Sequence, residues 1–287
     1  MIPVKAYPAD LIQQAVNGDK EALEALIKQI QDRIYGLAIR MLWHPADAED
    51  ATQEILVRIV THLGSFRGES SFSTWCYRIA TNHLLTTNKR RAERMEMTFE
   101  KCEEEIQSGI AYSWSHSTPE AEQRLMVEEL MIGCAQGMLL CLDRDLRISY
   151  ILGEVLELSS QQGGEILHIT PVAFRKRLSR ARSLLRDFLN KHCGLIEPSS
   201  SCKCDRQIPY AIKTGLVNPQ KLLFADHPRR DQRGSSIEQV LNEVSELEPV
   251  AGFFHSLPDY AAPNTFVENV RRIVGLHKSN NPSLSHR

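Results

Sequence analysis

The chain has 287 residues, of which 42% are hydrophobic and 24% are charged. This length and composition predict a soluble globular protein with about two domains of roughly 100 to 200 residues each. We expect a cytoplasmic protein, because no apolar run approaches the roughly 20 residues of a membrane span and the N-terminus lacks the pattern of a secretory signal. Seven cysteines are too few and too unevenly spaced for a disulfide framework in a chain of this length.

The net charge of −2 conceals a strong segregation of charge along the sequence. Between residues 172 and 191, seven basic residues stand against Asp187 alone, whereas between residues 95 and 129 nine acidic residues stand against two basic ones. A smaller basic group, which includes Lys89, Arg90 and Arg91, precedes the acidic segment. Two basic patches around an acidic connector fit a nucleic-acid partner, which the total charge alone would disfavour.

The apolar residues recur with a helical period in almost every segment, and the alternating pattern of strands is missing from the sequence, so we predict an all-α fold. A long amphipathic helix is predicted before Pro45, which suits the first turn of a second helix. Ser70 or Ser71 can cap a third helix over residues 72–91. Together these helices form a first predicted domain, residues 10–92.

An acidic segment with little periodicity, residues 93–117, is predicted to be a linker to a second helical domain, residues 118–192. The helices of that domain are expected at about residues 119–140 and 143–156, after Ser159, and after the cap and proline pair Thr170-Pro171. Residues 193–287 form a C-terminal extension. Two capping-box patterns, at Ser235 and at Thr265, predict helices there.

The segment from Leu158 to Arg182 has the pattern of a helix-turn-helix, in which a short helix and a tight turn precede a long basic helix. The residues expected to meet the major groove of DNA are Thr170, Val172, Ala173, Phe174, Arg175 and Arg177. Lys176, Arg180 and Arg182 are better placed to contact phosphates. The alternative is a solvated basic helix in a bundle.

The acidic stretch DAEDATQE, residues 47–54, places Asp50 and Glu54 on one side of the second helix. Paired carboxylates can serve acid–base catalysis or metal binding, but nothing in the sequence buries these two or recruits a substrate. The default interpretation is therefore a solvated helix face. The functional alternative is a surface that docks on a basic partner.

The loop FRGESS, residues 66–71, lies before the aromatic and polar side chains of the third helix. A glycine-containing loop beside aromatic rings can receive an unstacked base, while the basic triplet at residues 89–91 holds the nucleic-acid backbone. Trp75 itself is better explained as part of the core.

Three segments together carry a family resemblance: DAEDATQEILVRIV, FRGESSFSTWCYRIATNHLLTTNKRR and LSSQQGGEILHITPVAFRKRLSRARSLLRDFL. Their order and spacing resemble a bacterial RNA polymerase sigma factor of the sigma-70 class and the extracytoplasmic-function (ECF) type. The resemblance covers residues 10 to 190, about two thirds of the chain. It implies that residues 10–92 are similar to sigma region two and residues 118–192 to region four.

The resemblance also implies roles for individual residues. It implies that an acidic helix docks on core RNA polymerase through Asp50, Gln53 and Glu54. Recognition and opening of the minus-ten promoter element is carried over to Phe66, Arg67, Ser70, Ser71, Arg78, Asn82, Lys89, Arg90 and Arg91. Reading of the minus-thirty-five element is carried over to Thr170, Ala173, Phe174, Arg175, Lys176, Arg177 and Arg180.

The chain departs from the family pattern in the helix-turn-helix. Gly163 and Gly164 stand where the family favours larger residues, and each glycine costs about 0.5 to 1 kcal/mol relative to alanine. We therefore expect a looser scaffold there. His168 occupies the turn position where glycine is usual, which requires a left-handed backbone.

Three cysteines at the start of the extension, Cys193, Cys202 and Cys204, form a candidate site for zinc or copper(I), with His192 or His227 as a fourth ligand. A redox-inert surface cluster and a stress-induced disulfide are the alternatives. The extension is also expected to regulate the rest of the chain, by docking the apolar stripe of residues 236–254 on region two or region four.

The sequence as a whole predicts a promoter-specificity subunit that is not an enzyme and requires no cofactor. Its expected partners are core RNA polymerase and promoter DNA, with an anti-sigma factor as a third candidate and no membrane. The main alternative is a stand-alone helix-turn-helix regulator, which would leave the acidic helix and the FRGESS loop unexplained. A metal-dependent enzyme is disfavoured because the sequence has neither the metal-site motifs H-E-x-x-H and H-x-E with Cys-x-x-Cys nor a nucleophile motif.

Overall fold

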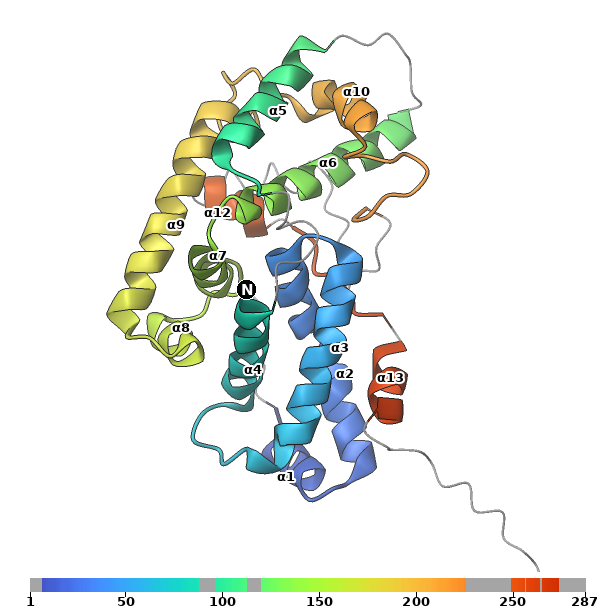
Figure 1. Ribbon diagram of the computed structural model, residues 1–287, viewed down its shortest axis with the longest axis vertical. Coiled ribbons are helices and arrows are strands. Elements are labelled where there is room, and N and C mark those ends of the chain that lie inside the picture. Colours follow the sequence, from blue (N-terminus) through green and yellow to red (C-terminus); the bar gives the residue numbers. More distant parts are fainter. Residues whose placement is uncertain are drawn as a thin grey trace, which may run out of the picture.

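The computed structural model describes residues 7–87, 96–112, 120–225, 249–255, 257–263 and 265–273. Within these ranges every regular element is helical, which confirms the predicted all-α class; Cys193 and Cys202 form an isolated bridge outside any strand. None of the helices in these ranges combines the length and the hydropathy needed to cross a bilayer. The helices build an elongated body with α1–α4 and α13 at one end and α5, α6, α9 and α10 toward the other (Figure 1).

The first predicted domain is a helical bundle whose helix starts follow its sequence signals. Asp19 accepts a hydrogen bond from the backbone N of Ala22 (2.8 Å), Pro45 occupies the first turn of its helix, and the Ser71 hydroxyl accepts from the N of Thr74 (3.1 Å). The last of these confirms Ser71 as the cap. The elements are α1 (Ala9–Val16), α2 (Lys20–Leu42), α3 (Pro45–His62), η1 (Leu63–Ser65) and α4 (Phe72–Thr86).

The second predicted domain contains the helices expected from the sequence. They are α6 (Glu120–Leu140), α7 (Arg144–Tyr150), the short π-helix η3 (Ile151–Val155), α8 (Ser160–Leu167) and α9 (Pro171–His192). Ser159 and Gln162 form a reciprocal capping box at the start of α8. Thr170 caps α9 by accepting from the backbone N of Ala173 (3.1 Å).

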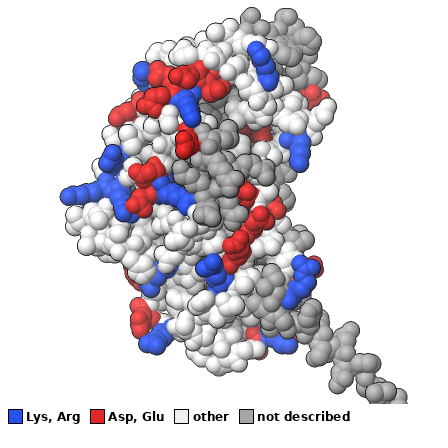
Figure 2. Space-filling model, in the orientation of Figure 1, with Lys and Arg blue, Asp and Glu red and all other residues white. Residues whose placement is uncertain are grey.

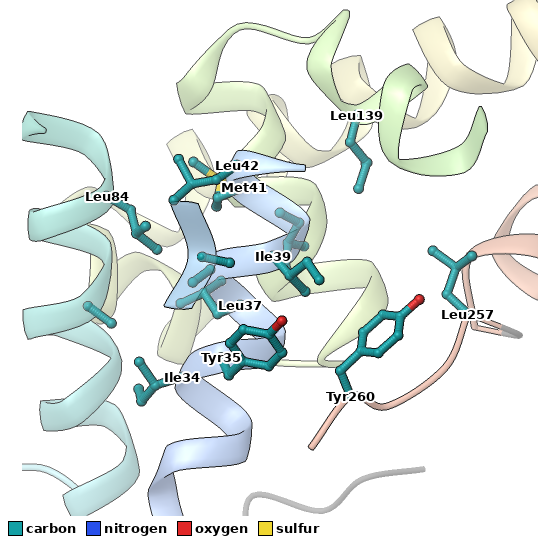
Figure 3. Close-up of a cluster of buried hydrophobic side chains, with 14 of the residues drawn as sticks. Ile34, Tyr35, Leu37, Ile39, Met41, Leu42, Leu84, Leu139, Leu257 and Tyr260 are labelled. Atoms are coloured by element: carbon teal, nitrogen blue, oxygen red, sulfur yellow. The ribbon is translucent and has the colours of Figure 1, made fainter. Parts of the chain in front are cut away.

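The core of the molecule is centred on the C-terminal half of α2 and is shared by all parts of the chain. Figure 3 shows side chains of α2 facing Leu84 of α4, Leu139 of α6, and Leu257 and Tyr260 of the extension. Leu84, Leu139 and Tyr260 are all buried, and they belong to one hydrophobic cluster. The predicted domains therefore pack together in this structure, and their exact boundaries stay a prediction.

Two arginines of α7 join the second domain to the first through backbone carbonyls. Arg147 is buried, and its guanidinium donates to the carbonyl oxygen of Met41 at the end of α2 (2.7 Å) and to those of Leu139, Leu140 and Leu142 (2.9 to 3.3 Å). Arg144 donates to the carbonyls at the end of α4, those of Leu85 (2.9 Å) and Thr87 (2.7 Å). Both arginines therefore donate to carbonyls at or just beyond the ends of helices, where backbone acceptors lose their partners within the helix.

The predicted linker contains a helix, so the expectation of an irregular connector over residues 93–117 was wrong. Helix α5 (Phe99–Ala111) begins with Thr98 as its cap. Phe99, Cys102 and Ile106 lie on one face and pack against the core, and the Phe99 ring lies 5.1 Å from that of Phe188 on α9. The few apolar residues of this face are hard to recognise as a helical pattern in an acidic sequence. The face is buried only by contacts with other helices.

Gly163 and Gly164 allow close packing, so the expectation of a looser helix-turn-helix was also wrong. A Cβ atom at Gly163 would lie 2.3 Å from the ring of Phe174 on α9, and one at Gly164 would lie 2.8 Å from the carbonyl oxygen of Ile169. The two glycines let α8 approach α9 and the turn. Their intrinsic cost in the helix is offset by this contact.

We expect Gly163→Ala to lower the free energy of unfolding by about 1 to 3 kcal/mol, because the added methyl group overpacks the contact with Phe174. The matched control is Gly137→Ala in α6, where a Cβ atom meets nothing within 4 Å. That substitution should stabilise the protein by up to about 1 kcal/mol. Chemical denaturation of both variants measures the difference. Equal effects at the two positions would contradict this account of α8.

The extension folds back over both domains. Its described helices are α10 (Cys204–Thr214), α12 (Pro249–His255) and α13 (Thr265–Ile273). The helix predicted at Thr265 is confirmed, whereas the helix predicted at Ser235 lies outside the described residues. Glu129 of α6 anchors the segment after α10, because its buried carboxylate accepts three backbone N–H groups, those of Leu223, Phe224 and Ala225 (2.7 to 2.8 Å).

Candidate functional site

The acidic side of α3 presents two carboxylates to solvent. Asp50 and Glu54 are exposed one turn apart, and Gln53 beside them is half-buried. Glu54 approaches the buried imidazole of His83 on α4, with Oε2 and Nε2 3.5 Å apart. Burial and the neighbouring Asp50 raise the pKa of Glu49 above its usual value. The structure thus brings the three predicted polymerase-contacting residues onto an accessible acidic edge.

The loop between η1 and α4 is organised by an aromatic cluster. The Phe66 ring lies 5.4 Å from Phe72 and 5.5 Å from Trp75, and the rings of Phe72 and Trp75 are stacked at 5.8 Å. Phe66 and Trp75 are half-buried and pack against the core, which supports the structural interpretation of Trp75. Arg67 is exposed in this loop and Gly68 has a φ of +73°. The loop is therefore a defined turn that exposes one cation, Arg67, and one anion, Glu69.

The other predicted minus-ten residues differ in how accessible they are. Asn82 is exposed on α4 and Ser70 is partly exposed, whereas the Ser71 hydroxyl is engaged in the cap of α4. Arg78 is half-buried and its Nη2 donates to Glu165 of α8 at 3.0 Å. Lys89, Arg90 and Arg91 lie outside the described residues. The sequence did not point to Glu165 as a partner of Arg78, because the two are 87 positions apart.

Helices α8 and α9 form the predicted helix-turn-helix. His168 ends α8 with φ 54° and ψ 40°, the left-handed conformation expected at this turn. Thr170, Arg175, Lys176 and Arg180 are exposed on α9, and Ala173 and Arg177 are half-buried. Val172 is 52% exposed near the start of the helix. An exposed apolar side chain among cations suits a helix that enters the major groove, where thymine offers a methyl group.

Phe174 is not a DNA contact, and its prediction as one was wrong. Its side chain is completely buried and packs between Gly153 and Gly163. Phe174 begins the apolar stripe of α9, which continues through Leu178, Ala181 and Leu185. The periodicity of that stripe was the signal that could have placed Phe174 on the inner face.

The basic side chains of α9 lie along its exposed side, and some of them are paired with neighbouring elements. Figure 2 shows Lys and Arg side chains along the edge of the molecule where α9 lies, and acidic side chains gathered over α5. Arg177 pairs with Asp145 of α7 (2.9 Å), Arg182 pairs with Glu154, and Arg175 donates to the Ser160 hydroxyl (3.0 Å). These contacts orient part of the basic face relative to α7 and α8.

The predicted metal site at the start of the extension is only partly described, because His227, one of its two candidate fourth ligands, lies outside the described residues. Among the described residues, which include Cys193, Cys202, Cys204 and His192, no group of three or more candidate ligands could hold a metal ion. Burial and the neighbouring Cys193 raise the pKa of Cys202 to about 11. Cys202 and Cys204 line an apolar cavity of about 350 Å³ between α5, α6 and α10. Binding of zinc or copper(I) by these cysteines stays a prediction.

This chain is similar to several known proteins. The Sigma-70 region 2 family matches residues 26–94. The RNA polymerase sigma-H factor of Pseudomonas aeruginosa is 29% identical over 180 residues, which cover 61% of this chain and 90% of that protein. The ECF RNA polymerase sigma factor SigW of Bacillus subtilis is 31% identical over 175 residues, covering 61% and 92%. The solved structure of the sigma factor RpoE in complex with the anti-sigma factor NepR from Bartonella quintana has a TM-score of 0.39 at 18% identity, covering 58% of this chain and 95% of that chain.

The chain therefore belongs to the ECF RNA polymerase sigma factors of the sigma-70 family. It is a transcription initiation factor, and this membership decides against the alternative of a stand-alone helix-turn-helix regulator.

Proposed function

We propose that this sigma factor binds core RNA polymerase through the acidic edge of α3, and that it contacts the promoter through α4 and α9. Asp50, Gln53 and Glu54 are the polymerase contacts. On the minus-ten side, the exposed Arg67 and Asn82 are the contacts within the described residues that are accessible in this structure. As a subunit that carries DNA recognition to the polymerase, the protein has no catalytic role of its own and acts in the cytoplasm.

The observation that carries this proposal is the exposed N-terminal half of α9. Thr170, Val172, Arg175, Lys176 and Arg180 share its solvent side, while Phe174 on its inner side fixes the helix to α8. A recognition helix needs this division between a buried anchor and an accessible row of side chains. Arg175 is placed for base edges, and Lys176 and Arg180 for phosphates.

Substitutions on α9 test the assignment of these roles. We expect Arg175→Ala to weaken minus-thirty-five binding by the holoenzyme by about 1 to 3 kcal/mol and to relax its sequence preference, because a base contact is lost. Lys176→Ala should weaken binding uniformly across sequences and lower the salt slope by about one. Binding of the holoenzyme to duplexes of varied sequence, measured at several salt concentrations, separates the two outcomes.

The control for these variants is Arg186→Ala, an exposed cation further along α9 that the proposal does not place on DNA. It should leave both the affinity and the sequence preference close to wild type. Equal losses for Arg175→Ala and Arg186→Ala would show that α9 contributes general charge and reads no base.

A further inference from the structure

The C-terminal segment 249–273 connects the two DNA-binding parts of the molecule. Its first helix, α12, lies on the second domain: the Phe254 ring meets that of Tyr150 edge-on at 5.1 Å, and His255 Nε2 lies 2.8 Å from the carbonyl oxygen of Glu154. Phe253 and Phe254 are both buried. This end of the segment is thus fixed to η3 and its surroundings.

Residues 257–263 then cross to the first domain. The Asp32 carboxylate of α2 accepts the backbone N–H of Ala262 (2.9 Å), and the Arg40 guanidinium lies 3.7 Å from the Asp259 carboxylate. Tyr260 is buried beside α2 and faces the same cluster as Tyr35 (Figure 3). An ion pair, a hydrogen bond and a buried ring therefore hold the crossing.

The last described helix, α13, lies against α2 and α3 (Figure 1). Phe266 and Val270 are buried, and the Phe266 ring meets the Tyr35 ring at 6.3 Å. Glu268 and Arg272 on its other side are exposed. Helix α13 is thus an amphipathic helix seated against α2 and α3.

While this segment joins the two domains, the parts assigned to promoter recognition, α4 in the first domain and the helix-turn-helix in the second, are in direct contact. Helix α4 packs on α8, and Arg78 of α4 is paired with Glu165 of α8 at 3.0 Å. The elements at minus ten and minus thirty-five are separated by about 25 base pairs, or roughly 85 Å at about 3.4 Å per base pair. Helix α9, which follows α8, is only about 33 Å long at about 1.5 Å per residue, so it cannot bridge that separation. One promoter cannot reach both surfaces while α4 and α8 touch.

We propose that residues 249–273 form an intramolecular strap that holds this sigma factor in a closed, inactive state. The strap binds the second domain through α12 and the first domain through α13, and its release lets α4 and α8 separate. The inference rests on the proposed function of these helices. The strap shares residues 249–254 with the predicted apolar stripe of residues 236–254, and the rest of that stripe, residues 236–248, lies outside the described residues.

The test is the full-length variant Val270→Asp, which places a carboxylate on the buried side of α13. Burying an unpaired charge costs far more than the roughly 1.4 kcal/mol that corresponds to a factor of ten, so docking of α13 should fall by about tenfold or more. Arg272→Asp is the matched control, because it introduces the same side chain on the exposed side. Phe266→Ala, which adds no charge, is a second release variant in case Val270→Asp fails to fold.

Two measurements are made on each variant: the radius of gyration without polymerase, and the rate of initiation with limiting sigma factor and core polymerase. The release variants should have a larger radius and a higher initiation rate than wild type, and Arg272→Asp should match wild type in both. An unchanged radius would overturn the strap, and so would a larger radius without faster initiation when the wild-type protein itself initiates. If the radius grows but no variant, wild type included, ever initiates, the proposed function fails while the closure of the domains by the strap is confirmed.

Discussion

Replacing Arg147 with alanine is expected to lower the free energy of unfolding by about 3 to 5 kcal/mol. The guanidinium is buried and donates to carbonyl oxygens of four residues, Met41, Leu139, Leu140 and Leu142. Alanine leaves those carbonyls buried without this donor, and hydrogen bonds from charged groups are worth about 1.5 to 3 kcal/mol each. Because Met41 belongs to α2 and the others flank α7, the loss should also weaken the contact between the domains.

Chemical denaturation of Arg147→Ala measures this effect, and two controls define its origin. Arg147→Lys keeps the charge but not the planar fork of donors, so it should recover only part of the loss. Arg180→Ala removes an exposed arginine and should change stability by less than about 0.5 kcal/mol. If Arg147→Ala cost no more than Arg180→Ala, the carbonyl contacts would not be stabilising the fold.

Reversing the acidic edge of α3 should produce the largest functional effect. The double variant Asp50→Lys, Glu54→Lys places two cations where we assign a surface for a basic partner, and loss of such charge pairs costs about 2 to 5 kcal/mol. Affinity for core polymerase should therefore fall by about 30-fold or more. Both side chains are exposed, so the helical content measured by circular dichroism should remain that of wild type.

The matched control reverses two exposed carboxylates with the same spacing on α5, Glu100→Lys with Glu104→Lys. This pair carries the same change of charge at a site that the proposal leaves out of the polymerase interface. Its affinity for core should stay close to wild type at physiological salt. Similar losses in both double variants would mean that polymerase senses the total charge of the chain and not the edge of α3.

The local signals in the sequence predicted much of the fold because they act within one turn of a helix. Ser71 and Thr170 are the caps that the sequence indicated, and His168 has the left-handed backbone expected at its turn. These positions depend on neighbours three or four residues away. Sequence reasoning is strongest for such features, and it correctly placed the helix-turn-helix.

Features that depend on distant partners could not be predicted from the sequence. The apolar face of α5 is covered by α10, where Gln207 donates to the carbonyl oxygen of Ile106 (3.1 Å) from 101 positions away. The hydrogen bond between Ala262 and Asp32 spans 230 positions. Phe174 was misassigned for a different reason. The sequence showed its place at the start of the apolar stripe of α9, but we gave more weight to its place among the residues expected to face the groove.

In vitro transcription with purified core polymerase and a promoter library tests the central claim most directly. We expect the full-length protein to make core polymerase initiate selectively, from templates that share two elements, and we expect initiation to be lost in the double variant Asp50→Lys, Glu54→Lys. Failure of the wild-type chain to associate with core polymerase, or association without any directed start site, would contradict it.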